Sequence, residues 1–204
     1  MPVAFEQKIE DKHIMVWEIT EPLSFFAQQI VLNKEESEAY HNIRFEKRKL
    51  EWMAARYVQR LLINDTTTKD QFGKPHLQNL KGYISISHCQ NYAAAIFSAQ
   101  KPVGIDIEPT NEKILRIADK YTSQNEFNFI DKNKEVEHLI NNWCIKEAIY
   151  KYYGKKELNF KENICIQPYL LSDQTCTVLF SKNEEKEELK IHFNKIKDII
   201  ISFL

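Results

Sequence analysis

Cysteine and glycine are scarce in this chain, and their placement excludes several classes of protein. Of the 204 residues, four are cysteine and four are glycine. The cysteines stand far apart and no Cys-x-x-Cys pair occurs, so neither a zinc framework nor a compact disulfide scaffold is expected. We expect four reduced, mostly buried thiols, as in a cytoplasmic protein.

Long apolar runs are also missing. The N-terminal residues alternate between charged and apolar types and lack the apolar stretch of a signal peptide. The longest late apolar run, residues 199–204, is interrupted by Ser202 and is far too short to cross a bilayer. These features predict a cytoplasmic protein that does not act at a membrane.

The chain carries no excess of either charge. Lysine and arginine number 28 against 29 for aspartate and glutamate. A general nucleic-acid binder normally has a basic excess, so that class is disfavoured, although a local basic pocket for a phosphorylated small molecule is still compatible. With 43% apolar and 28% charged residues the composition is globular, and the length suits one large domain or two halves of about 100 residues.

The pattern of apolar residues predicts an α+β fold. Alternation and β-branched residues indicate strands, whereas threefold and fourfold spacing indicates helices. Strands are expected at residues 13–19, 83–87, 92–99 and 103–108, and helices at 34–64, 112–120, 123–131 and 135–153, with a small antiparallel sheet after residue 163. Each half then runs strand, helix, strands. We place the boundary at Pro102, which gives an N-terminal half of residues 1–102 and a C-terminal half of residues 103–204.

Two carboxylates stand two residues apart in the segment Gly-Ile-Asp-Ile-Glu. On a strand, Asp106 and Glu108 point to the same face. Like charges side by side destabilise each other unless a cation or hydrogen-bond donors neutralise them, and Mg²⁺ prefers such oxygen ligands. Solvated charges on an exposed strand edge are the plainer interpretation of the same pair.

A second acidic element lies on the predicted helix 135–153. Trp143, Glu147 and Lys151 are four residues apart in succession and share one stripe of the helix. The plain interpretation is a surface Glu–Lys pair beside a core tryptophan. The alternative makes Glu147 a third metal ligand or a base and gives Lys146 and Lys151 contacts to phosphate. Spacing alone does not choose between them.

Basic and hydroxyl side chains occur in three further segments. Lys74 stands in a Gly-Lys-Pro turn and is either a plain turn residue or a positioned charge for phosphate. Ser87 and His88 end a predicted strand, and no Gly-x-Ser-x-Gly elbow is present to make a serine nucleophile. On the basic stretch of helix 34–64, Arg56 falls between apolar positions and is therefore expected near the buried edge.

The order of these segments resembles the surfactin-type phosphopantetheinyl transferases. The motifs GKP, SISH, GIDIE and WCIKEAIYK occur in that order, and the resemblance covers roughly residues 44–155. It implies a monomer of two similar α+β halves related by a pseudo-twofold axis, with coenzyme A bound in the cleft between them. One departure is the segment 109–111, Pro-Thr-Asn, where some relatives have a lysine.

The resemblance also implies roles for individual residues. Asp106, Glu108 and Glu147 would hold Mg²⁺ with the coenzyme A pyrophosphate, and Glu147 would also act as the base for the acceptor serine. Lys151 would contact phosphate and assist the leaving group.

Other roles concern coenzyme A binding. Lys74, Ser87 and His88 would contact coenzyme A, with the histidine near the ribose phosphate. Arg48 and Arg56 are assigned to the nucleotide, because the usual basic residues of the first half do not align with this chain. Lys146 is added as a further substrate contact, and Glu126 resembles an acidic position of the family.

We therefore expect the transfer of the 4′-phosphopantetheine group of coenzyme A to a serine of an acyl or peptidyl carrier protein, with release of 3′,5′-ADP. The residue types suit that chemistry, since attack on a phosphate needs charge neutralisation, positioning and a proton acceptor. The rival hypothesis is a non-catalytic scaffold that binds coenzyme A or a carrier protein. A third is an unrelated interaction module in which every motif is surface charge.

Overall fold

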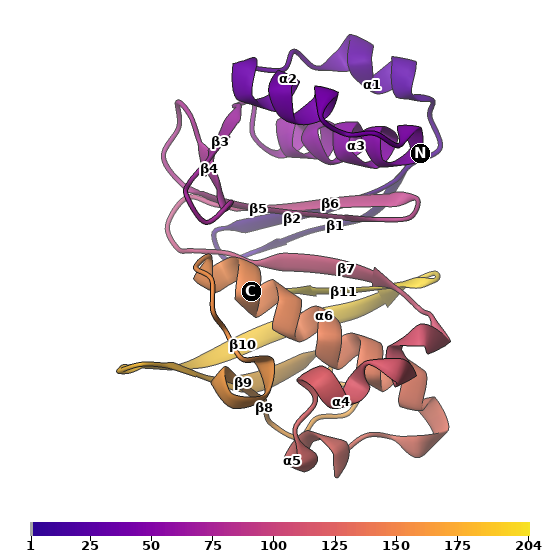
Figure 1. The fold of residues 1–204 in the computed structure, drawn as a ribbon, viewed down its shortest axis with the longest axis vertical. Helices are drawn as coiled ribbons and strands as arrows, with labels where there is room; N and C mark the ends of the chain where they lie inside the picture. Colours follow the sequence, from indigo (N-terminus) through magenta and orange to yellow (C-terminus); the bar gives the residue numbers. More distant parts are fainter. Residues whose placement is uncertain (1) are drawn as a thin grey trace.

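The computed structural model describes residues 2–204 and has two antiparallel sheets with helices on their outer faces (Figure 1). One sheet has the strand order β1-β2-β6-β5, and the other has the order β7-β11-β10-β9-β8. The strands are β1 (Val3–Ile9), β2 (Lys12–Glu18), β3 (Thr67–Lys69), β4 (Pro75–Leu77), β5 (Tyr83–Cys89), β6 (Tyr92–Ser98), β7 (Ile105–Pro109), β8 (Ile164–Ile166), β9 (Thr175–Lys182), β10 (Glu185–Ile196) and β11 (Ile199–Phe203). The predicted α+β class is confirmed, although β1 was not predicted.

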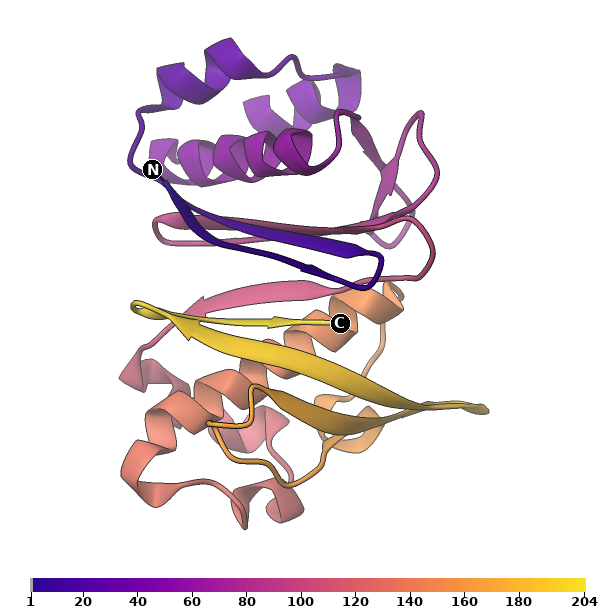
Figure 2. The same ribbon diagram turned by 180° about the vertical axis from the view of Figure 1, so that it is seen from behind.

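Three helices lie on the outer side of the first sheet, of which the longest packs against the strands and the other two lie farther out (Figures 1 and 2). They are α1 (Leu23–Gln29), α2 (Lys34–His41) and α3 (Glu46–Leu62). The prediction of one helix over residues 34–64 is therefore wrong. Asn33 and Glu36 form a reciprocal capping box that starts α2, and the buried carboxylate of Glu36 accepts two hydrogen bonds from Arg60 of α3. This ion pair holds α2 beside α3, which requires a turn between them.

The second sheet is covered by α6 (Glu135–Tyr153), as Figure 1 shows. The prediction that this helix ends at Gly154 is confirmed, since Gly154 has φ 69° and adopts the left-handed conformation that stops a helix. Gly104, just before β7, permits a close approach to α6, because a Cβ atom there would lie 2.0 Å from the carbonyl oxygen of Ala148. The shorter elements are η1 (Glu112–Arg116), α4 (Ala118–Tyr121), α5 (Gln124–Phe127), η2 (Lys132–Lys134) and α7 (Phe160–Asn163).

The inner faces of the two sheets pack against each other, giving four layers in the order helix, sheet, sheet, helix (Figures 1 and 2). Their shared core is apolar and combines Ile14, Val16, Ala94 and Ile96 of the first sheet with Ile105, Ile107, Ile199 and Ile201 of the second. The two sheets share a pairing pattern. In the first, β2 precedes the long helix α3 and pairs with β6, which pairs with β5. In the second, β7 precedes the long helix α6 and pairs with β11, which pairs with β10. The division at residue 102 and the pseudo-twofold relation stay predictions.

Two expectations about absences can be compared with the described residues. Across residues 2–204, all four cysteines are free thiols, but only Cys144 and Cys176 are buried, whereas Cys89 and Cys165 are partly exposed. No helix in this part of the chain combines the length and apolarity needed to cross a membrane.

Candidate active site

Three segments that are distant in the sequence meet at Asp106. This residue lies on β7, is only 4% exposed, and receives two hydrogen bonds on Oδ1. The Ser87 hydroxyl donates from the end of β5 at 2.8 Å, and the Lys151 ammonium donates from the last turn of α6 at 2.6 Å. The close approach allowed by Gly104 brings this turn of α6 to the strand. Asp106 therefore links β5 of the first sheet to β7 and α6.

Glu108 shares the α6-facing side of β7 with Asp106. Its Oε1 accepts a hydrogen bond of 2.9 Å from Nε1 of Trp143 on α6, whereas Ile105 and Ile107 point into the core between the sheets. The predicted placement of the two carboxylates on one face is confirmed. The indole bond was not predicted, although the stripe of Trp143 and Glu147 on the predicted helix already indicated that they share a side.

The carboxylates perturb one another. Burial, followed by the charge of Asp106, raises the pKa of Glu147 to about 7. Burial and the charges of Asp106 and Glu147 raise the pKa of Glu108 to about 7, and Lys151 opposes the rise at both glutamates. Raised pKa values caused by burial and by neighbouring like charges are typical of functional sites.

The carboxylate oxygens near Asp106 are of the type that binds a divalent cation, although they do not surround a ready-made site for one. Within residues 2–204, no three acidic, histidine or cysteine side chains are arranged to hold a metal ion. However, Oδ2 of Asp106 is buried and has no hydrogen-bond partner in the described chain. A buried carboxylate oxygen without a partner, beside two carboxyls that repel it, fits the oxygen-rich coordination that Mg²⁺ prefers. Asp106, Glu108 and Glu147 are therefore the candidate ligands, although their carboxyls are not gathered into a three-ligand site in the described residues.

His88 lies among cations at the end of β5. Its Nδ1 is 3.5 Å from Oε2 of Glu51. Burial, followed by the charges of Arg48, Lys151 and Arg56, lowers the pKa of His88 to about 4. The ring is therefore neutral at neutral pH, and the surrounding positive charge comes from both halves of the chain. Such a place is suited to an anion such as phosphate.

Arg56 is buried at the edge of this cationic region, as its apolar neighbours in the sequence predicted. Only 6% of the residue is exposed, its guanidinium carbon lies 4.5 Å from the ring centre of Trp52, and its Nε lies 3.7 Å from Glu36. Burial lowers the pKa of Arg56 to about 10, so that it stays charged at neutral pH. Arg48 is exposed. Sequence reasoning missed Glu36 and Glu51, because isolated glutamates on a charged helix carry no distinguishing pattern.

The Gly-Lys-Pro turn reaches the C-terminal end of α6. The ammonium of Lys74 donates a 2.5 Å hydrogen bond to the carbonyl of Tyr152, and burial lowers its pKa. Gly154 makes room for this side chain, since a Cβ atom there would lie 2.2 Å from Cδ of Lys74. A pocket of about 170 Å³ opens beside the turn, lined by residues of both halves: Phe72, Gly73, Lys74, Pro75, Ile84, Ser85, Ile86, Tyr150, Lys151, Gly154 and Lys155.

Lys146 is not part of the site, and its predicted substrate contact is wrong. Its side chain is completely buried and forms an ion pair of 2.8 Å with Glu126, which is equally buried. The ammonium also donates to the carbonyl oxygens of Tyr121, Phe160 and Ile164. Four acceptors surround the three hydrogens of the ammonium and leave none free for a substrate, so Lys146 and Glu126 tie α6 to its neighbours.

Comparison with known proteins identifies the family. A sequence model of the 4′-phosphopantetheinyl transferase superfamily matches residues 102–204, half of the chain. The chain belongs to this superfamily. Its relatives place it in the surfactin-type branch, as the motif order predicted.

Two relatives illustrate the similarity. The 4′-phosphopantetheinyl transferase Sfp of Bacillus subtilis is 33% identical over 89 residues, which are 42% of this chain and 39% of that protein. The 4′-phosphopantetheinyl transferase gsp of Aneurinibacillus migulanus is 30% identical over 128 residues, 61% of this chain and 51% of that protein. The chain thus spans about half or less of the length of these relatives.

Proposed function

We propose that this protein transfers the 4′-phosphopantetheine group of coenzyme A to a serine of an acyl or peptidyl carrier protein and releases 3′,5′-ADP. Membership of the superfamily supports the reaction class. The observation that carries the proposal is the cluster at Asp106, where two further carboxylates with raised pKa values and Lys151 meet between the two halves. Surface charges without a function would not be buried in this way.

The proposed metal is Mg²⁺, with Asp106, Glu108 and Glu147 as its ligands. When bound, it would neutralise the negative charge of the coenzyme A diphosphate. The protein's own part is to hold the three carboxyls in place. Ser87 and Trp143 hold two of them by donating hydrogen bonds to Asp106 and Glu108.

Glu147 is the proposed base. The acceptor serine hydroxyl attacks the β-phosphorus of coenzyme A and gives its proton to the Glu147 carboxylate, while the bond from that phosphorus to the bridging oxygen breaks. In the metal-free protein, burial and the charge of Asp106 raise the pKa of Glu147 to about 7, so its carboxylate is a stronger base than an ordinary one. Lys151 is placed to stabilise the negative charge that 3′,5′-ADP carries away.

Lys74, Ser87, His88, Arg48 and Arg56 are the proposed coenzyme A contacts. The cationic surroundings of His88 support a phosphate there, and the pocket beside Lys74 supports binding between residues 1–102 and 103–204. Ser87 would then have a second role, because its hydroxyl already donates to Asp106. We further propose that the protein acts as a monomer, since both halves of the site come from one chain. A cytoplasmic location stays a prediction.

The rival function is a scaffold that binds coenzyme A or a carrier protein without catalysis. The carboxylate cluster disfavours it, because a pure binder gains nothing from three acidic groups that would face a diphosphate. A scaffold would bind coenzyme A yet leave carrier proteins unmodified.

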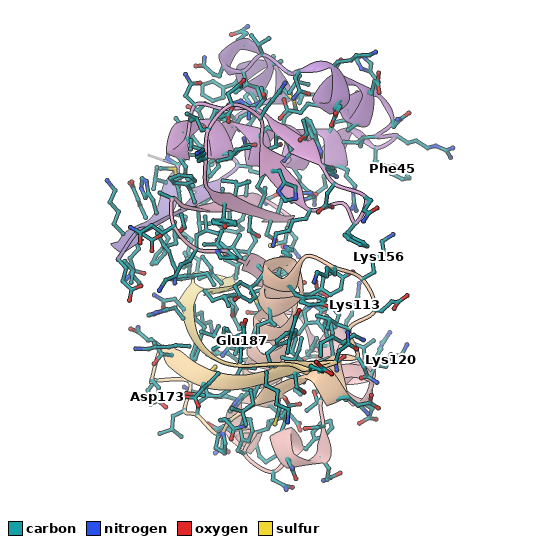
Figure 3. All side chains as sticks on the ribbon, turned by 90° about the vertical axis from the view of Figure 1, so that its left-hand side faces the viewer. Phe45, Lys113, Lys120, Lys156, Asp173 and Glu187 are labelled. Atoms are coloured by element: carbon teal, nitrogen blue, oxygen red, sulfur yellow. The ribbon has the colours of Figure 1, made fainter. Side chains whose placement is uncertain are left out.

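The decisive experiment follows the mass of an apo-carrier protein incubated with this protein, coenzyme A and Mg²⁺. We expect a mass gain of one phosphopantetheine, and no gain in EDTA. Asp106→Asn should lower the rate by about a thousandfold or more, because it removes the charge on which the site is built. The matched control is Asp173→Asn, an exposed carboxylate that Figure 3 shows on the opposite side from Phe45 and Lys156.

Each outcome separates the two functions. A metal-dependent gain that Asp173→Asn keeps and Asp106→Asn loses supports the transferase. If several acyl and peptidyl carriers stay unmodified while coenzyme A binds in calorimetry, the scaffold is the better description.

A further inference from the structure

Lys151 forms an ion pair with Asp106, the carboxylate at the centre of the proposed metal site. Its Nζ lies 2.6 Å from Oδ1 of Asp106, and the side chains are 27% and 6% exposed. The Ser87 hydroxyl donates to the same oxygen, so Oδ1 already has two donors. A divalent cation bound to Asp106 would therefore meet the ammonium at close range. The two positive charges compete for one carboxylate.

The surrounding charges are balanced only in part by this lysine. Three carboxyls lie close enough to perturb one another, and Lys151 lowers the pKa of both Glu108 and Glu147. Oδ2 of Asp106 stays without a partner within residues 2–204. The arrangement is tolerable in the absence of a metal because the ammonium supplies part of the missing positive charge.

The side chain of Lys151 is also free to move away from Asp106. It lies on the last turn of α6, three residues before Gly154, and its partly exposed side chain has a flexible four-carbon stem. Its movement would not disturb the helix backbone. Lys146 on the same helix has no such freedom, because its ammonium is saturated by buried acceptors.

We propose that Lys151 is an internal counter-cation that competes with the divalent ion for Asp106, so that metal binds poorly alone and well together with a diphosphate. The diphosphate would receive the displaced ammonium as a new partner, which offsets the loss of the Lys151–Asp106 ion pair. The two ligands are thereby coupled through one side chain. This inference rests on the proposed function, since it takes the diphosphate to be that of coenzyme A.

The test measures Mn²⁺ binding by the electron paramagnetic resonance signal of the free ion, in the wild type and in Lys151→Met. With Mn²⁺ alone, we expect the variant to bind about tenfold more tightly, because its competitor is gone. With saturating coenzyme A the order reverses, and the variant binds Mn²⁺ less tightly than the wild type, because it lacks the ammonium that the diphosphate would receive. An increase and a loss in the same variant cannot come from a merely structural role.

Lys156→Met is the matched control, since Lys156 is an exposed lysine just beyond the same helix end. It removes the same charge and should bind Mn²⁺ as the wild type does. If it gains affinity as much as Lys151→Met does, general charge explains the effect and the proposal is wrong. Should Lys151→Met fail to fold, as judged by circular dichroism, Lys151→Gln keeps a donor for Asp106 and is expected to give the same tighter binding.

The outcomes distinguish this inference from the proposed function. Equal, weaker or undetectable binding of Mn²⁺ alone by a folded Lys151 variant overturns the competition. If instead coenzyme A fails to bind the wild type even with Mn²⁺, the proposed function fails, while the affinity ratio for Mn²⁺ alone still decides whether Lys151 competes.

Discussion

The two sides of α6 each carry a lysine–carboxylate pair, and they differ in how completely the charges are satisfied. Lys146 and Glu126 are both fully buried, and the ammonium reaches three carbonyls besides the carboxylate. Glu126 accepts further bonds from the backbone amides of Ser123 and Ile166. On the other side, Lys151 is partly exposed while Asp106 is buried, and Oδ2 of Asp106 lacks a partner within the described residues.

The difference separates a structural ion pair from a functional one. A buried pair whose remaining donors and acceptors are occupied gives no opening for a ligand, and removing one member leaves an uncompensated charge. A pair with an unpaired carboxylate oxygen, beside carboxyls whose pKa values are raised, can be stabilised further when a cationic ligand binds. The same helix therefore anchors the C-terminal half on one side and presents the reactive groups on the other.

The largest expected effect comes from removing the structural lysine. Lys146→Met leaves the Glu126 carboxylate buried without its cation, and we expect the free energy of unfolding to fall by about 3–5 kcal/mol. Urea unfolding in EDTA measures it. Adding Glu126→Gln should recover part of the loss, because the neutral amide no longer needs a counter-ion.

An exposed ion pair provides the control for this prediction. Lys132 and Glu135 form one at 2.8 Å with side chains 69% and 38% exposed. Lys132→Met should change the stability by less than about 0.5 kcal/mol. If Lys146→Met were as mild as this, the contrast between the two sides of α6 would have no energetic basis.

A smaller effect of opposite sign is expected at Glu147. Its pKa in the folded protein is raised to about 7, above the ordinary 4.5. A carboxyl with a raised pKa destabilises the fold progressively as the pH rises from about 4.5 to about 7. Glu147→Gln should therefore stabilise the metal-free protein at pH 8 by about 1–2 kcal/mol, after allowance for solvent screening, and change little at pH 5.

Thermal or urea unfolding at the two pH values tests this. The exposed Glu135 on the same helix offers Glu135→Gln as a control, which should be nearly neutral at both pH values. A Glu147→Gln variant that is less stable than the wild type at pH 8 would mean that the carboxylate is satisfied in the free protein, contrary to the comparison.

Local sequence patterns were sufficient to predict the elements that form the site. Alternation placed Asp106 and Glu108 on one face of β7, and Gly154 marked the end of α6, because both signals depend on backbone geometry within a few residues. The separation of α2 from α3 was missed. It depends on the ion pair between Glu36 and Arg60, which are far apart in the sequence.

The two lysines of α6 could not be told apart from the sequence. They flank Glu147 and differ by five residues, which places them about 140° apart around the helix. In an amphipathic helix the apolar stripe shows which side faces the core. In α6, however, buried residues occur on both sides, and they include polar residues such as Asn141 and Asn142 as well as apolar ones. Only the tertiary contacts assign Lys146 to the structure and Lys151 to the site.

The smallest expected effect concerns the pKa of His88, which lies near Lys151 rather than near the Lys146–Glu126 pair. Burial and three neighbouring cations lower its pKa to about 4, so nuclear magnetic resonance should show a neutral ring from pH 5 to 8 in the free protein. A bound phosphate would offset those cations and favour the protonated ring, so coenzyme A should raise the pKa toward the ordinary value of about 6.5. Dephospho-coenzyme A, which lacks the ribose phosphate, should raise it less. Equal shifts with both ligands would mean that the ribose phosphate does not bind near His88. The cations around His88 would then contact another part of coenzyme A.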